Sequence, residues 1–215
     1  MPDESRIPEA SVYRLSLYHC FLGEAIRTGA TGARVTSREL AEELNIKEET
    51  VRRDLSFIGN VGRPGSGYDA EGLFRALQEF LGLKDEHPIV KVGSAQMLRA
   101  LQVVFPAHSY GVEPVAYFSE LPDDVGTTID NIEIKHVTDI PNLDRALEAT
   151  LALVACSPAW VHRILELLCS AGVTGVLLLT PAIKLDIPEG MNVTHVRMPC
   201  DLKSLACRCR VPLNR

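Results

Sequence analysis

Long apolar runs are missing from this sequence, which has no stretch of the roughly 18 apolar residues that a membrane-spanning helix needs. The opening residues MPDESRIPEASVYR are polar and acidic, unlike a signal peptide, so we expect a cytoplasmic protein. In that reducing compartment the six cysteines do not predict a framework of disulfides. No histidine stands in a metal-binding pattern such as H-E-x-x-H, and we find no general base or proton donor, so we expect no enzyme.

Positive charge is also scarce, because 22 Lys and Arg residues stand against 28 Asp and Glu, and the formal net charge is −6. A protein that binds nucleic acid often carries a basic surface, so any DNA-binding function here must depend on a local patch. The rest of the composition is that of a folded protein, with 46% hydrophobic and 23% charged residues over 215 positions. This length suits one large domain or two modest ones.

The hydrophobic pattern changes near residue 85 and predicts two domains. Before this point, apolar residues recur at helical spacing in residues 11–29, 36–46, 47–59 and 71–83, and a glycine-rich segment covers residues 59–69. After it, strands are predicted at residues 87–93, 112–118, 150–156 and 174–180, and helices at 94–104, 143–149 and 157–172. The alternation predicts an α/β protein, in which a winged helix-turn-helix precedes a Rossmann-like, doubly wound parallel sheet. We place the domains at residues 1–84 and 85–198, with a C-terminal tail at 199–215.

Two short helices joined by a tight turn and followed by a glycine-rich hairpin are typical of a winged helix-turn-helix that binds DNA. The first of these helices opens with a capping box, Thr36 to Glu39. The second would enter the major groove, and the hairpin would contact a neighbouring phosphate or the minor groove. The candidate DNA-binding residues are Ser37, Arg38, Lys47, Thr50, Arg52, Arg53, Ser56, Arg63, Gly65, Gly67 and Tyr68. The alternative is a solvated helix in which Arg53 pairs with Glu49, since similar patterns occur in enzymes and protein-binding domains.

The segment from Val51 to Tyr68, VRRDLSFIGNVGRPGSGY, resembles the signature of the Rex redox-sensing repressors. RLSLYHCFL at residues 14–22 is similar to the opening helix of that family, and residues 171–182 and 187–202 are similar to its late strand and closing segment. The resemblance covers nearly the whole chain and is most specific in the winged helix. It implies a homodimer that binds an operator in double-stranded DNA, senses the ratio of NADH to NAD+, and releases DNA when NADH binds.

The resemblance also implies an NAD(H) site, and here the sequence departs from the family. A Rossmann site needs G-x-G-x-x-G after its first strand, because the glycines make the turn, admit the pyrophosphate and let the helix pack on the strand. The corresponding residues are Gly93, Ser94, Ala95, Gln96, Met97 and Leu98, so only the first glycine is present. The acid that should end the second strand and bind the ribose is replaced by Ser119, which is followed by Glu120.

Three interpretations of this candidate cofactor site remain open. The helix N-terminus still offers amides to an anion, which favours weak NAD(H) binding. The site would otherwise bind another nucleotide or adenine-containing ligand, or belong to a vestigial fold whose cleft is filled by Met97 and Leu98. We therefore predict a Rex-like transcriptional repressor. The alternative is a regulator of the same architecture that has lost NAD sensing and responds to thiol oxidation or to no ligand.

The C-terminal tail differs from the apolar helix that Rex proteins usually exchange between subunits. It is basic and contains Cys200, Cys207 and Cys209, and cationic neighbours favour reactive thiolates. Three cysteines without a fourth ligand make a poor zinc site, so we predict no metal and unremarkable thiols in a frayed terminus, with a redox thiol as the alternative. By the resemblance, Arg14 of the opening helix and Asp201 of the tail form an ion pair across the dimer in one state of a switch.

Overall fold

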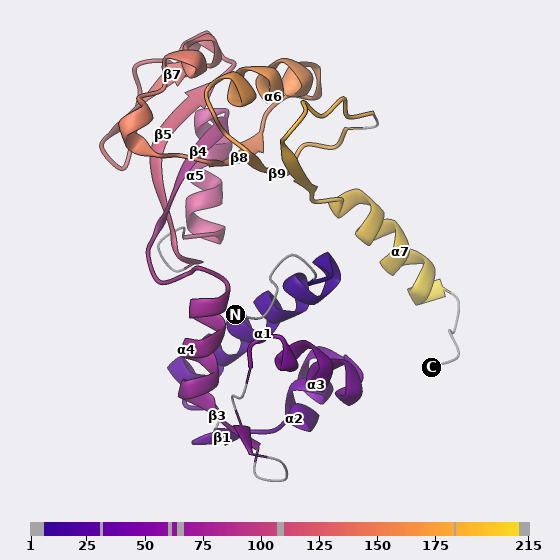
Figure 1. The fold of residues 1–215 in the computed structure, drawn as a ribbon. Coiled ribbons are helices and arrows are strands. Elements are labelled where there is room, and N and C mark those ends of the chain that lie inside the picture. The colour runs from indigo at the N-terminus through magenta and orange to yellow at the C-terminus, as the bar shows by residue number, and fades with distance from the viewer. Residues whose placement is uncertain are drawn as a thin grey trace. The chain divides into compact units, whose positions relative to one another are not determined.

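A computed structural model describes residues 7–30, 32–59, 62–63, 67–106, 110–182 and 184–210. The chain folds into two compact units, Met1–Asp85 and Glu86–Arg215, which are drawn in indigo to purple and in magenta to yellow in Figure 1. Among the described residues, no helix is both long and apolar enough to span a membrane.

The N-terminal unit is a helical domain with a small antiparallel sheet. Its sheet has the strand order β1-β3-β2. In chain order its elements are α1 (Glu9–Thr28), β1 (Arg34–Val35), α2 (Ser37–Leu44), α3 (Glu48–Ser56), β2 (Gly62–Arg63), β3 (Gly67–Asp69) and α4 (Ala70–Phe80). This is the predicted helix-turn-helix followed by a hairpin, so the winged-helix part of the fold prediction is confirmed.

Local signals in the sequence set the ends of these helices. The capping box at α2 forms as predicted, because the Thr36 side chain accepts from the Glu39 amide and the Glu39 side chain accepts from the Thr36 amide. Asn45 ends α2 in the left-handed conformation, which gives the tight turn before α3. The helices bury a shared apolar core, whose completely covered members include Leu15, Leu22, Leu40, Val51, Leu73 and Leu77.

The C-terminal unit is built on a seven-stranded sheet with the order β10-β9-β8-β4-β5-β7-β6. All neighbouring strands are parallel except β6 and β7. The strands are β4 (His87–Gly93), β5 (Val112–Ser119), β6 (Thr128–Ile129), β7 (Ile132–His136), β8 (Leu151–Ala155), β9 (Gly175–Leu178) and β10 (Asn192–His195). The α-helices are α5 (Ala95–Val104), α6 (Val161–Ser170) and α7 (Met198–Arg210), and the short 3-10 helices are η3 (Pro122–Asp124), η4 (Val137–Asn142), η5 (Arg145–Leu147) and η6 (Pro158–Trp160). The predicted Rossmann-like sheet is thus confirmed.

Helices cover both faces of this sheet, as Figure 1 shows for α5 and α6. Ala95 and Leu98 of α5 pack on Tyr117 and Ile134, whereas α6 packs on the opposite face in the larger apolar cluster. From β4 the chain first builds outward to β5, and it later returns to the other side of β4 with β8. The carboxyl ends of β4, β5 and β8 therefore flank a topological switch point, where open α/β sheets bind ligands.

Five segments differ from the prediction. The helix predicted at residues 143–149 is wrong, since only the three-residue η5 forms there and Glu148 ends it with a positive φ of 49°. The short strands β6, β7 and β10 were not predicted, although Ile132 and Ile134 alternate with polar residues in β7. The frayed terminus is also wrong for residues 198–210, which form the helix α7 with its side chains exposed.

Candidate DNA-binding and nucleotide sites

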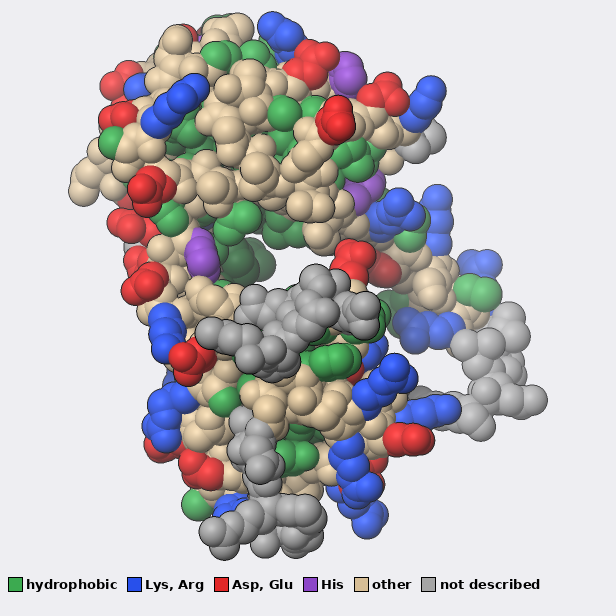
Figure 2. Space-filling view, viewed as in Figure 1, with side chains coloured by type: hydrophobic (Ala, Val, Ile, Leu, Met, Phe, Trp, Pro, Cys, Tyr) green, Lys and Arg blue, Asp and Glu red, His purple; other side chains and the backbone are tan. Residues whose placement is uncertain are grey.

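The outer side of α3 and its N-cap, Lys47, carry five of the predicted DNA-binding side chains. Lys47, Arg52, Arg53 and Ser56 are exposed, and Thr50 is half-buried. Figure 2 shows Lys and Arg side chains gathered over the part of the N-terminal unit that contains α2 and α3. Arg38, Arg52 and Arg53 share this surface with Glu42, Glu48 and Glu49, so its cations stand among carboxylates and its contact with DNA stays a prediction.

The two arginines of α3 differ in their side-chain partners. Arg52 forms an ion pair with Glu48 at 2.5 Å and donates from Nε to the Ser37 hydroxyl at 3.3 Å. Arg53 has no ion pair or hydrogen bond from its side chain within the described residues, and the alternative pair with Glu49 is not formed. The guanidinium group of Arg53 is therefore available to an incoming anion, whereas that of Arg52 must leave a partner first.

The predicted residues of α2 lie close to α3 but are held by internal contacts. Ser37 is buried and its hydroxyl donates to Glu48 at 3.0 Å, so this side chain joins the two helices. Arg38 is exposed and forms an i,i+4 ion pair with Glu42 at 2.8 Å. Their proposed contacts with DNA stay predictions.

The wing is described only in part. Gly65 and the side chain of Arg63 lie outside the described residues, although the backbone of Arg63 belongs to β2. Gly67 has a φ of +67°, and a Cβ built on it would lie 2.8 Å from the carbonyl oxygen of Val35. Glycine is therefore required here to let β3 pair with β1, which is a structural role beside any contact with DNA. Tyr68 is half-buried in β3.

A buried carboxylate, which the sequence reading missed, fixes α3 against α1. Asp54 is completely buried and accepts two hydrogen bonds from Arg14, at 2.6 Å from Nε and 2.8 Å from Nη2. It also accepts from the Tyr18 hydroxyl at 2.8 Å, and Arg14 donates to Ser11 at 3.0 Å. The signal was present in the spacing, because Asp54 lies three residues after the buried Val51 on the inner side of α3.

The charges in this network are strongly coupled. Burial alone would raise the pKa of Asp54, but the hydrogen bonds from Arg14, Tyr18 and Ser11 outweigh it and the pKa is lowered. Burial, followed by the hydrogen bond to Asp54, raises the pKa of Tyr18. At neutral pH Asp54 is thus a carboxylate held by two donor side chains from α1, which sets the orientation of α3.

The second candidate site lies at the carboxyl end of β4. Ser94 caps α5, and its hydroxyl accepts from the Met97 amide at 3.3 Å. A Cβ on Gly93 would lie 2.7 Å from the carbonyl oxygen of Ala155, so the one glycine retained from the motif is needed for close packing of β4 against β8. Ala95 and Leu98 lie on the buried side of α5, whereas Gln96 and Met97 of the same helix are exposed.

The protein's own carboxylates bind the amides at this switch point. Asp124 of η3 accepts from the Ala95 amide at 2.9 Å and from the Ser119 hydroxyl at 2.6 Å, through the same oxygen. Glu120 is 8% exposed, and its Oε1 accepts from the Ser157 amide at 2.8 Å. Its other oxygen, Oε2, has no hydrogen-bond partner among the described residues.

These contacts bear directly on whether NAD(H) fits. In a Rossmann site the first amides of the helix after the first strand face the pyrophosphate. Here the amide of Ala95 already donates to a carboxylate, and a phosphate at that place would meet the negative charge of Asp124. Ser119, at the position of the ribose-binding acid, donates to Asp124. In this conformation the residues present do not fit the pyrophosphate of a dinucleotide.

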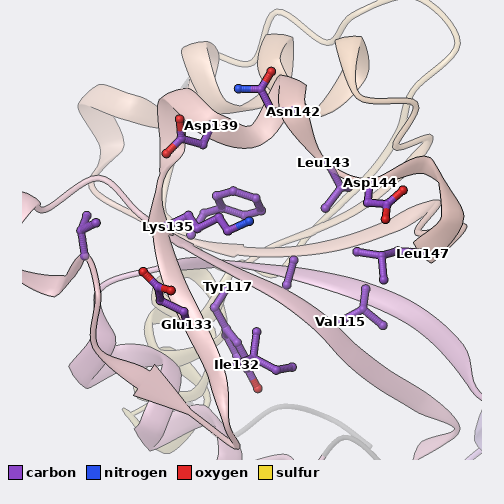
Figure 3. A pocket seen from close by; sticks show the side chains of 13 residues that line it. Val115, Tyr117, Ile132, Glu133, Lys135, Asp139, Asn142, Leu143, Asp144 and Leu147 are labelled. Carbon is purple, nitrogen blue, oxygen red and sulfur yellow. The ribbon is translucent and has the colours of Figure 1, made fainter.

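A separate cavity of about 530 Å³ lies beside β5 and β7 under the η4–η5 segment, and Figure 3 shows its lining. Lys135, Glu133, Asp139 and Asp144 supply its charges, and its apolar wall includes Val115, Leu143 and Leu147. None of the predicted cofactor-binding residues lines this cavity. The cavity is therefore distinct from the nucleotide crevice that the sequence predicts.

The remaining predicted residues concern the switch and the tail. Arg14 pairs with Asp54 inside the N-terminal unit, while Asp201 lies exposed in α7, so their pairing across a dimer stays a hypothesis. Cys200, Cys207 and Cys209 are exposed on the same helix. In the part of the chain that the structure describes, no cluster of three His, Cys, Asp or Glu residues suits a metal ion. Burial, and then the charge of Glu120, raises the pKa of Cys156 to about 11, so this thiol stays protonated at neutral pH.

Comparisons with known proteins match both units. The family model of the putative DNA-binding protein N-terminus matches residues 6–56. The redox-sensing transcriptional repressor Rex of Chloroflexus aggregans is 30% identical over 92% of this chain and 92% of its own. Rex of Staphylococcus epidermidis is 30% identical over 95% of this chain and 96% of its own.

Solved structures give the same fold. The crystal structure of RSP, a Rex-family repressor, has a TM-score of 0.82 at 22% identity and covers 95% of this chain and 94% of that one. The structure of RSP with β-NAD+ and operator DNA has a TM-score of 0.83, and the one with β-NADH has 0.80. The coverage is close to complete in both directions, so the match includes both units.

The winged helix and the Rossmann-like sheet together define a transcription regulator with a DNA-reading unit and a separate sensor-type unit. The identity to its relatives over nearly the full length then places the chain in one family. It belongs to the Rex family of redox-sensing transcriptional repressors, as the sequence signature predicted.

Proposed function

We propose that this protein is a homodimeric repressor that binds an operator in double-stranded DNA through α3 and the wing. The observation that carries the proposal is the exposed side of α3, where Arg53 and Lys47 are free of ion pairs among the described residues. Buried contacts from Asp54 hold this helix rigidly against α1. A rigid helix with free cations matches how winged helices dock in the major groove.

The comparisons support the partners in this proposal. One solved Rex-family structure contains operator DNA together with β-NAD+, and another contains β-NADH. A dimer with two winged helices reads two half-sites about one helical turn, roughly 34–36 Å, or a multiple of that apart. The expected operator is therefore an inverted repeat. The relatives are transcriptional repressors, which supports a regulatory and not a catalytic role for the Rossmann-like unit.

Selection of bound duplexes from a random DNA pool tests the proposal. The full-length protein should enrich an inverted repeat, whereas the Arg53→Ala variant should enrich it much less. Arg75→Ala is the matched control, because Arg75 is an exposed arginine on α4 and is paired with Glu71. Enrichment of the same repeat by all three proteins would remove α3 as the reading element, and enrichment of no sequence by the unaltered protein would refute DNA recognition.

Binding of NAD(H) by this chain is a question apart from DNA binding, because its dinucleotide motif is altered. The loss of two glycines and of the ribose-binding acid supports NAD(H) binding that is weaker than in relatives with the full motif. The alternative is a repressor of the same architecture that does not respond to NAD(H). The contacts of Asp124 and Glu120 favour a specific form of this alternative.

A further inference from the structure

We propose that Asp124 and Glu120 are built-in anions that occupy the phosphate positions of the nucleotide crevice and keep dinucleotides out. This inference rests on the weak NAD(H) binding proposed above for the Rossmann-like unit. It identifies two residues that set the ligand specificity of this crevice, neither of which belongs to the glycine motif.

Both contacts lie at the carboxyl edge of the sheet, directly after a strand. The Ala95 amide opens α5 directly after β4, and the Ser157 amide precedes η6 directly after β8. The amide that opens the helix after the first strand is a donor that a Rossmann fold turns toward a bound phosphate, and the Ser157 amide lies at the same edge of the sheet, at the end of the neighbouring strand β8. In this chain each of them donates to a carboxylate, at 2.9 Å for Asp124 and 2.8 Å for Glu120.

The Glu120 side chain crosses the end of the central strand. Glu120 follows β5, whereas Ser157 follows β8, and β4 lies between these strands. Two strand spacings amount to roughly 10 Å, so the bond between Glu120 and Ser157 must cross the carboxyl end of β4. That end is where a pyrophosphate lies above the glycine turn. A dinucleotide therefore has to displace the buried Glu120 side chain as well as Asp124.

Asp124 is held in place from several sides. The Ser119 hydroxyl donates to its carboxylate at 2.6 Å and itself accepts from the Leu121 amide at 3.1 Å. The carbonyl oxygen of Asp124 accepts from the Thr127 side chain at 2.6 Å. Ser119, which stands where the family has its ribose-binding acid, thus orients Asp124 toward α5. The serine at position 119 therefore helps Asp124 to block the crevice.

The two carboxylates also determine what kind of ligand is excluded. A pyrophosphate carries negative charge, and like charges at contact distance repel, most strongly beside the buried Glu120. Charge and volume therefore act together against phosphate-bearing nucleotides. Because Asp→Asn and Glu→Gln keep the shape of the side chain and remove the charge, the charge contribution can be separated experimentally.

The test is calorimetric titration of the full-length protein with NADH. The unaltered protein should show a dissociation constant in the millimolar range or no measurable heat. Asp124→Asn should bind NADH at least about tenfold more tightly, and Asp124→Asn with Glu120→Gln more tightly still. Asp123→Asn is the matched control, because Asp123 is an exposed carboxylate in the same turn, and it should leave the affinity unchanged.

Ser119→Ala provides a second route, since it removes the hydroxyl that holds Asp124 without changing the net charge. It should also strengthen NADH binding, by less than Asp124→Asn does. Micromolar NADH binding by the unaltered protein would overturn the proposal, as would an equal effect of the substitutions at residues 123 and 124. DNA selection is measured independently, so either result would leave the proposed repressor function untouched.

Discussion

Replacing Asp54 by asparagine should destabilise the N-terminal unit selectively. The substitution keeps the side-chain volume but removes the charge that pairs with Arg14, whose side chain is 26% exposed against 1% for Asp54. Breaking a fully buried pair from one side costs about 3–5 kcal/mol. Because Arg14 keeps part of its surface in water, we expect a smaller loss, about 2–3 kcal/mol of the free energy of unfolding.

The chain contains its own reference for this measurement. Trp160, its single tryptophan, lies in the C-terminal unit, so tryptophan fluorescence reports on that unit alone. Far-UV circular dichroism follows both units, and two independent units give separate urea transitions. In Asp54→Asn the transition seen only by circular dichroism should move to lower urea, and the fluorescence transition should stay in place.

An exposed pair serves as the matched control. Glu42→Gln breaks the surface ion pair with Arg38 and should change the free energy of unfolding by only about 0–1 kcal/mol. An Asp54→Asn curve that coincides with the unaltered protein, or an equal shift of both transitions, would refute the reasoning that Asp54 fixes α3 on α1.

The same pair gives a pH dependence with a definite sign. The pKa of Asp54 is lower in the folded unit than its ordinary value. A depressed carboxyl pKa contributes stability that is present above the unfolded pKa of about 3.9 and is lost as the pH falls through the folded pKa. The unaltered protein should therefore lose stability below about pH 4 more steeply than Asp54→Asn does.

Three further predictions concern DNA, the wing and the tail. Arg53→Ala should weaken operator binding by about 1–3 kcal/mol in fluorescence anisotropy, and Arg52→Ala should weaken it less, because Arg52 is already paired with Glu48. Unchanged affinity of both variants would remove α3 from the interface. Gly67→Ala should lower the stability of the N-terminal unit by about 1–3 kcal/mol, and by more than Gly29→Ala does, because a Cβ on Gly29 would meet nothing within 4 Å although its φ is similar. Equal thermal shifts of the two variants would contradict the close contact with Val35. Asp201→Ala should alter DNA affinity if the residue pairs with Arg14 across the dimer, and unchanged affinity with an unchanged response to NADH would exclude that pair.

Local and repetitive signals made the fold predictable. The Thr36–Glu39 capping box, the helical periods and the buried strands all depend on neighbouring residues, and each formed where it was expected except the helix at residues 143–149. The prediction of a helix at residues 143–149 was wrong. Apolar spacing does not show that Asp144 caps the start of this helix and Glu148 already ends it, which leaves only three residues between them. The edge strands were missed because they are short and half exposed.

The site residues could be predicted only where they all lie in one continuous segment of the sequence. The exposed residues of α3 follow from helical spacing, and so does their place in the second helix of the motif. The Asp54–Arg14 and Asp124–Ala95 contacts join residues 40 and 29 positions apart, and no local pattern gives such pairs. Gly93 was interpreted as part of a nucleotide motif, but its contact with Ala155 shows that the sheet also requires a glycine there.

In vitro transcription from a promoter that contains the selected inverted repeat tests the central claim most directly. Adding the unaltered protein should reduce the transcript in proportion to occupancy of the site, and Arg53→Ala should require a higher concentration, by roughly the factor that 1–3 kcal/mol implies. A promoter with a scrambled repeat should be unaffected by either protein. Undiminished transcription when the repeat is saturated with the unaltered protein would contradict the assignment of this chain as a repressor.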